Sequence, residues 1–234
     1  MTDLVSGLLQ ALDLIRRGDA SLGQIVALSL QVSGSALVFA ALCGLPLRTW
    51  LALSRFRTRG LAIALIYTGM GLPPVVVGLF VYMFLSHAGP LGFLNWLFTP
   101  NAMVVAQVII ATPLIAGFVM AAVMGVDPEL RQQLHGLGAT RVQATLSVLL
   151  EARVGIVVAL VAGFGGIISE VGAVMLVGGN IEGATRVLTT AIVLETRQGQ
   201  FDRALALGLV LLALSFVINL FVFIMQGRGT PAKA

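Results

Sequence analysis

Few side chains in this sequence could take part in chemistry away from water. Glu170 is the only ionisable residue inside a predicted membrane-spanning segment, where a charge is costly enough to mark a candidate for function. We expect it to act as a gate or packing group, partnered by Arg186, backbone amides, Thr189 or Thr190. The alternative is a structural carboxylate near the membrane interface whose hydrogen bonds are all satisfied.

The sequence offers little for enzymatic catalysis. His87 and His135 fall on opposite sides of the membrane in the topology predicted below, so they cannot share a metal ion. HExxH and Walker A patterns do not occur, and Cys43 stands inside an apolar run without a second cysteine to pair with. We therefore expect no enzyme activity, no metal site and no cofactor in this chain.

Composition places the chain in a membrane. Of its 234 residues, 58% are hydrophobic and only 10% are charged, an apolar share beyond that of water-soluble domains. The formal charge of +4 comes from basic residues that flank apolar segments, which argues against a nucleic-acid surface. The predicted class is an all-α integral membrane protein.

Five segments have about 20 apolar residues, the length needed to span a bilayer. They are residues 25–47, 61–85, 102–126, 154–177 and 204–225. The loops on one side carry nine Lys and Arg residues against five on the other, which predicts an external N-terminus and a cytoplasmic C-terminus. Residues 1–20 are predicted as an interfacial helix and residues 226–234 as a cytoplasmic tail.

The longest polar interruption, residues 127–153, predicts a helix-turn-helix on the cytoplasmic side. Asp127, Pro128 and Glu129 have the order of an N-cap, a first-turn proline and a first-turn acid. Gly136 and Gly138 would end this first helix. Thr140 is a plausible cap for the second helix. Such a surface suits another protein, although an amphipathic loop lying on the bilayer is the alternative.

Helix-breaking residues interrupt two of the predicted spans. Pro73 and Pro74 follow two glycines in the second span, and Pro113 lies in the third. Such breaks either line an aqueous pathway or are kinks that help packing. The glycines at residues 163–166 in the fourth span favour close helix packing. Residues 186–196 are too short and polar to cross, and predict a helix at the external rim.

Residues 169–181, SEVGAVMLVGGNI, and the segment that follows them resemble the tungstate-type permeases, within the molybdate, tungstate and sulfate group of ABC importers. GMGLPPVVVGL at residues 69–79 and the glycines and proline of residues 89–92 fit the same family. The resemblance covers residues 21–225. The cytoplasmic loop is similar to the family's "EAA" loop at its glycine, but Gln-Gln-Leu replaces Glu-Ala-Ala and the closing proline is missing.

This resemblance implies a type-1 ABC importer permease in the bacterial inner membrane. Two copies would form a homodimer with two cytoplasmic ATPases, which hold the ATP and magnesium, and with an external substrate-binding protein. Transport would proceed by alternating access. Tungstate is the implied substrate, with molybdate or sulfate as alternatives. The residues expected to dock onto the ATPase are Leu130, Gln132, Gln133, Leu134 and Gly138. The residues expected to line or gate the pathway are Pro73, Pro74, Gly165, Gly166, Ser169, Glu170, Asn180, Thr185, Arg186 and Thr189.

Neutral donors suit a transported dianion because they orient it without holding it too tightly to leave. A carboxylate would repel the dianion, so Glu170 is a poor direct ligand. Arg186 is expected to pair with Glu170 or Glu182; an ordinary exposed arginine is the alternative.

Two other functions remain open from the sequence. An ion-coupled secondary carrier would show inverted repeats and several intramembrane acids, of which only one is present. A membrane anchor for other subunits would assemble without moving any substrate.

Overall fold

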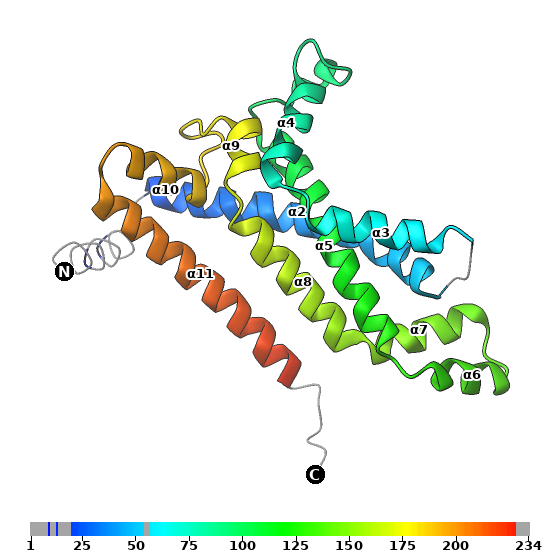
Figure 1. The fold of residues 1–234 in the computed structure, drawn as a ribbon. Helices are drawn as coiled ribbons and strands as arrows, with labels where there is room; N and C mark the ends of the chain where they lie inside the picture. Colours follow the sequence, from blue (N-terminus) through cyan, green and yellow to red (C-terminus); the bar gives the residue numbers. More distant parts are fainter. Residues whose placement is uncertain (1–8, 10–12, 14–19, 54–56, 228–234) are drawn as a thin grey trace. The chain divides into compact units, whose positions relative to one another are not determined.

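The computed structural model describes residues 9, 13, 20–53 and 57–227, and these residues form helices without any strand (Figure 1). The helices are α2 (Ala20–Leu53), α3 (Arg59–Met70), α4 (Pro74–Leu85), the 3-10 helix η1 (Gly92–Leu94), α5 (Pro100–Met124), α6 (Pro128–Gly136), α7 (Arg141–Glu151), α8 (Arg153–Ile168), α9 (Gly172–Gly178), α10 (Leu188–Arg197) and α11 (Phe201–Gly227). The all-α prediction is confirmed. The expected interfacial helix of residues 1–20 lies almost wholly outside the described residues, as does most of the expected tail.

Among the residues that the structure describes, three helices are long and apolar enough to cross a membrane, namely Ala20–Gly44, Pro100–Met124 and Phe201–Phe221. The number rises to five if each of two bent helix pairs, α3 with α4 and α7 with α8, counts as one span. The predicted fourth span, residues 154–177, is not one helix. The 16-residue α8 ends at Ile168 and α9 begins at Gly172, so Glu170 lies in a break between two helices.

The described chain divides into two compact units. The first unit holds Met1–Ala36, Pro73–Gln107 and Gly165–Ala234, and the second holds Leu37–Leu72 and Val108–Phe164. The helices α2 and α5 each contribute one part to each unit.

In the first unit, α4 packs against α9, and α10 packs against α11. A Cβ atom at Gly78 would lie 2.6 Å from the Cα atom of Ala173, so α4 can approach α9 this closely only without a side chain there. Leu22, Leu188 and Leu207 form a buried apolar cluster that joins α2, α10 and α11. Figure 1 accordingly shows α10 beside the beginning of α2.

In the second unit, small residues again allow close contact. A Cβ atom at Gly163 of α8 would lie 2.5 Å from the Ile115 side chain of α5, which confirms the packing predicted for this glycine. Pro113 does not break α5, which continues through it. The Thr112 hydroxyl donates to the Val108 carbonyl at 2.7 Å, one turn earlier in the same helix.

We predict that Gly78→Val lowers the free energy of unfolding by about 1–3 kcal/mol, because its side chain would collide with the Ala173 backbone. Gly34→Ala is the matched control, since an added Cβ atom there meets no atom within 4 Å and alanine favours the helix. Thermal unfolding of the full chain in detergent measures both. Equal midpoints for the two variants would contradict the close contact of α4 and α9.

Candidate functional site

A short break, residues 169–171, separates α8 from α9 in the first unit. The Ser169 hydroxyl donates to the carbonyl oxygens of Gly165 at 2.8 Å and Gly166 at 3.2 Å. Such side-chain bonds compete with helical ones, and the two glycines weaken the helix further. A helix that ends inside a membrane leaves backbone groups that water cannot satisfy. These groups therefore need partners within the protein.

Side chains from α5, from α10 and from the break itself supply these partners. Gln107 of α5 is buried and donates Nε2–H to the Ile167 carbonyl at 2.9 Å, across 60 residues of sequence. Thr189 of α10 donates its hydroxyl to the Glu170 carbonyl at 2.9 Å. The Glu170 carboxylate accepts from the Ala173 amide at 2.9 Å, which satisfies one free N–H at the start of α9. The break is thus closed by hydrogen bonds.

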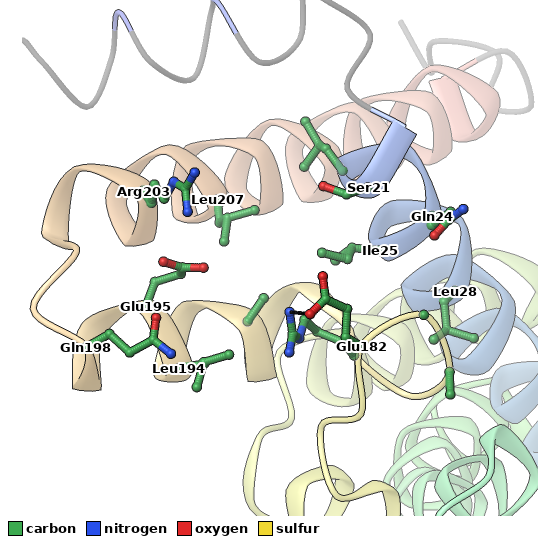
Figure 2. A pocket seen from close by; sticks show the side chains of 15 residues that line it. Ser21, Gln24, Ile25, Leu28, Glu182, Leu194, Glu195, Gln198, Arg203 and Leu207 are labelled. Atoms are coloured by element: carbon green, nitrogen blue, oxygen red, sulfur yellow. Dashed lines mark ion pairs between the residues drawn. The ribbon is translucent and has the colours of Figure 1, made fainter.

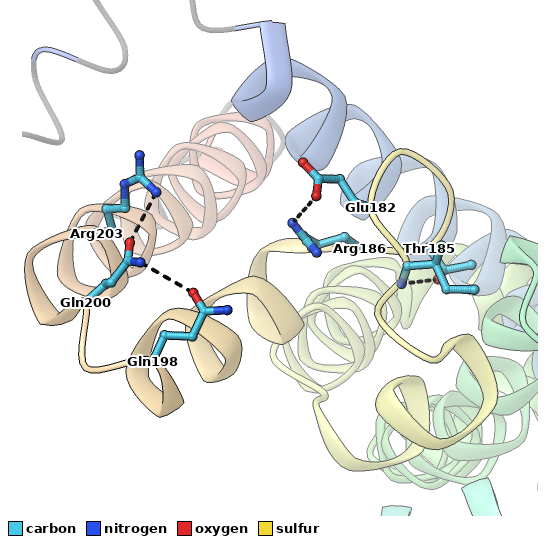
Figure 3. Close-up of polar contacts among 7 residues, drawn as sticks. Glu182, Thr185, Arg186, Gln198, Gln200 and Arg203 are labelled. Atoms are coloured by element: carbon cyan, nitrogen blue, oxygen red, sulfur yellow. Dashed lines mark hydrogen bonds and ion pairs between the residues drawn. The ribbon is translucent and has the colours of Figure 1, made fainter.

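Several partners were expected for the Glu170 carboxylate, among them Arg186 and backbone amides. The structure shows a backbone amide, that of Ala173. The expected pair with Arg186 is wrong, because Arg186 Nη1 lies 3.4 Å from Glu182 Oε2 (Figure 3). The pair of Arg186 with Glu182, the other alternative, is confirmed. Thr190 bonds the Val187 amide at 3.1 Å and not the Glu170 carboxylate.

The loop from α9 to α10 is held by Thr185, which is fully buried. Its hydroxyl donates to the Gly178 carbonyl at 2.5 Å and accepts from the Ile181 amide at 2.9 Å. Gly179 and Asn180 both have positive φ, at 71° and 53°, and turn the chain sharply after α9. The hydroxyl protons of Thr185, like those of Ser169 and Thr189, are donated within the chain. Their expected contact with an anion stays a prediction.

The break predicted in the second span is confirmed. The helix α3 ends at Met70, Pro73 is extended with φ −63° and ψ 122°, and Pro74 is the first residue of α4. This position suits Pro74, whose missing N–H would have had no helical partner there. The break coincides with the chain's passage from the second unit to the first.

In the second unit, the predicted helix-turn-helix of residues 127–153 is confirmed as α6 and α7. Asp127 Oδ1 accepts from the Glu129 amide at 2.8 Å, and Thr140 forms a reciprocal capping box with Gln143. Gly138 has φ +84° between the two helices.

The helix α6 presents an accessible surface. It buries no residue fully: Leu130 and Leu134 are half-buried, while Gln132 and Gln133 are exposed. Beyond it, Leu137 is 84% exposed. Leu130 and Gln133 also border an open cavity of about 580 Å³ formed with the ends of α5 and α8. The expected docking residues are therefore within reach of a partner.

Sequence reasoning missed Gln107, which closes the break from a distant helix. Its signal was a single amide in an otherwise apolar segment, since a buried amide needs a partner. It also missed Ser29 of α2, whose hydroxyl accepts from the Leu188 amide at 2.9 Å and so satisfies the first residue of α10. Serine is common in membrane-spanning helices, so Ser29 could not be recognised from the sequence in the way that Gln107 could.

Comparison with known proteins places this arrangement in a family. Residues 36–231 match the model of the family described as binding-protein-dependent transport system inner membrane component. The chain belongs to this family. It is 43% identical over 86% of its length to a probable anion ABC transporter permease protein of Haloferax volcanii, covering 90% of that protein. It is 38% identical to the tungstate uptake system permease protein TupB of Peptoclostridium acidaminophilum, with 97% of this chain and 99% of that protein covered.

More distant relatives belong to the same group. A molybdenum transport system permease protein, ModB of Escherichia coli, is 30% identical over 83% of this chain and 89% of its own length. The expected resemblance to the permeases of oxyanion ABC importers is confirmed. The chain is therefore a multi-pass inner-membrane component of a transport system.

Solved structures support the fold alone. A chain from a bacterial alginate ABC transporter, in complex with alginate pentasaccharide-bound periplasmic protein, gives a TM-score of 0.74 at 23% identity. This match covers 90% of the present chain and 80% of the other. A chain from an amino acid ABC transporter gives 0.70 at 18% identity, covering 93% and 97% of the two chains. The fold is that of the ABC importer permeases.

We predict that Glu170→Ala destabilises the start of α9 by about 0.5–2 kcal/mol, the usual cost of losing a side chain that accepts from a helix N-terminus. Glu170→Gln keeps an acceptor oxygen and is expected to lose less. Amide hydrogen exchange at Ala173 measures the local effect, and thermal unfolding measures the global one. If Glu170→Gln lowered stability as much as Glu170→Ala in both measurements, the negative charge of Glu170, and not its hydrogen bond to Ala173, would be the stabilising feature.

Proposed function

We propose that this chain is the permease subunit of an ATP-driven importer for a tetrahedral oxyanion, with tungstate as the favoured substrate. The observation that carries the proposal is the 38% identity to a tungstate uptake permease over 97% of this chain. The relative named as a molybdenum permease is less similar, at 30% identity. Molybdate and sulfate are the competing substrates.

In the proposed complex, two copies of this chain form the membrane pathway. Two cytoplasmic ATPases would bind ATP and magnesium and dock onto α6, while an external binding protein delivers the anion. This arrangement places the N-terminus outside and the C-terminus in the cytoplasm. It is supported by the exposed, capped helices α6 and α7, because two short rigid helices can pass on a displacement that a flexible loop would absorb.

The proposed moving elements are the helix breaks. Pro73 and Pro74 separate α3 from α4. Gly165 and Gly166 precede the break between α8 and α9, and Ser169 is its first residue. A break whose hydrogen bonds come from side chains can exchange partners without unfolding a whole helix. Each such bond contributes only about 0.5–1.5 kcal/mol net, so opening the break lies within the energy available from docking and ligand binding. Hydroxyls released in this way would offer neutral donors to the anion.

Transport by vesicles tests this function. The chain is reconstituted with its ATPase and binding protein, and tungstate uptake is measured with ATP, without ATP, and with an ion gradient alone. We expect uptake only with ATP and the ATPase, and weaker competition by molybdate and sulfate than by unlabelled tungstate. Uptake driven by the gradient alone would make the chain a secondary carrier. An assembled complex without any uptake would make it an anchor.

We predict that Gly138→Ala weakens ATPase binding roughly tenfold. Its φ of +84° costs a residue with a Cβ atom about 1–2 kcal/mol, which would distort the turn between α6 and α7. Gly136→Ala is the matched control, because Gly136 is the last residue of α6 and an added Cβ atom meets nothing within 4 Å. Affinity is measured between the purified permease and ATPase. Equal ATPase affinities for the two variants would show that the conformation of Gly138 does not contribute to docking.

A further inference from the structure

A cavity of about 640 Å³ lies within the first unit, apart from the helix break (Figure 2). Its walls come from the beginning of α2, the loop before α10, α10 itself and the beginning of α11. This volume is within the range of about 300–1,000 Å³ that ligand pockets occupy.

One polar atom in each of two charged side chains of this cavity lacks a hydrogen-bond partner among the described residues. The Nε–H of Arg186 and the Oε2 atom of Glu195 are both buried without one. Arg186 contacts Glu182 through its Nη1 atom instead. A buried donor or acceptor without a hydrogen bond is costly. A bound ligand could satisfy both atoms by supplying an acceptor to Arg186 Nε–H and a donor to Glu195 Oε2.

The cavity lining holds two basic and two acidic side chains, so its formal charges sum to zero. Arg186 and Arg203 face Glu182 and Glu195 around the same space. Figure 2 shows Glu195 on α10 and Arg203 on α11 with their side chains directed into the space between the two helices. Arg203 Nη1 is hydrogen-bonded to Gln200 Oε1 at 3.1 Å (Figure 3). A ligand with one positive and one negative group fits this lining better than a simple anion, which the two carboxylates would repel.

The cavity also has an apolar wall. Leu22, Ile25, Leu28, Leu194 and Leu207 line it. Two apolar membrane helices, Ala20–Gly44 and Phe201–Phe221, begin at this cavity, and only 11% of the second is buried within the protein. An amphiphile could therefore place its polar group in the cavity and its chains along α11.

We propose that this cavity binds the headgroup of phosphatidylethanolamine. The phosphate accepts from Arg186 Nε, and the primary ammonium donates to Glu195 Oε2. Phosphatidylcholine satisfies only the first requirement, because its quaternary ammonium has no N–H. Phosphatidylglycerol lacks the cation. The site depends on the membrane location of the chain and not on which ion it transports.

Native mass spectrometry of the full chain, titrated with lipids of identical acyl chains, tests the site. We expect phosphatidylethanolamine to bind roughly tenfold more tightly than phosphatidylcholine, the difference between a charge-assisted and an ordinary contact. Glu195→Gln is expected to abolish this preference while leaving phosphatidylcholine binding unchanged. Arg186→Gln is expected to weaken both lipids, because the phosphate is common to them.

Arg197→Gln is the matched control, since Arg197 lies exposed in the last turn of α10 and outside the cavity lining. It should bind both lipids as the unaltered chain does. Thermal unfolding shows whether each variant is folded, and the lipid preference of the unaltered chain tests the proposal without any variant. Equal binding of the two lipids would overturn it. So would displacement of the lipid by tungstate, which would assign the cavity to the transported anion.

Discussion

Backbone groups that leave a helix inside a membrane must find partners in the protein, because hydrocarbon offers none. The break between α8 and α9 shows how this chain meets the requirement. Gln107 and Thr189 donate to carbonyl oxygens at the break, and the Glu170 carboxylate accepts from the first turn of α9. These three polar side chains are thus committed to the backbone, and they allow the chain to be irregular at this point.

The same constraint explains why a charged residue is tolerated at the break. The beginning of a helix carries partial positive charge, so a carboxylate is stabilised there without a basic partner. Glu170 occupies such a position at α9, which leaves Arg186 to pair with Glu182 in the following loop. An intramembrane acid can therefore serve the backbone. Its presence alone does not identify a ligand for the transported ion.

Local signals in the sequence predicted the cytoplasmic helices well. The caps at Asp127 and Thr140 act within three residues, and the positive φ of Gly138 follows from the short turn that it must make. The break at residues 169–171 was missed because the apolar character of residues 154–177 continues through it. What stabilises the break is remote in sequence, as with the contact of Gln107 and Ile167 across 60 residues. The hydropathy of a segment indicates whether it lies in lipid or in water, but it does not show which groups form hydrogen bonds with its backbone.

The distribution of charge limits how this chain could select an anion. Two arginines of the first unit lie close to a carboxylate or an amide: Arg186 contacts Glu182, and Arg203 contacts Gln200. Arg197 lies exposed in the last turn of α10. A fixed, desolvated arginine would bind a dianion too tightly for release, since conduction requires that an ion also leave. Neutral hydroxyls avoid this difficulty, but those of Ser169, Thr185 and Thr189 already donate to backbone carbonyl oxygens. In the proposed transport cycle, contact of these hydroxyls with the anion would therefore require that they exchange their backbone hydrogen bonds as the ion passes.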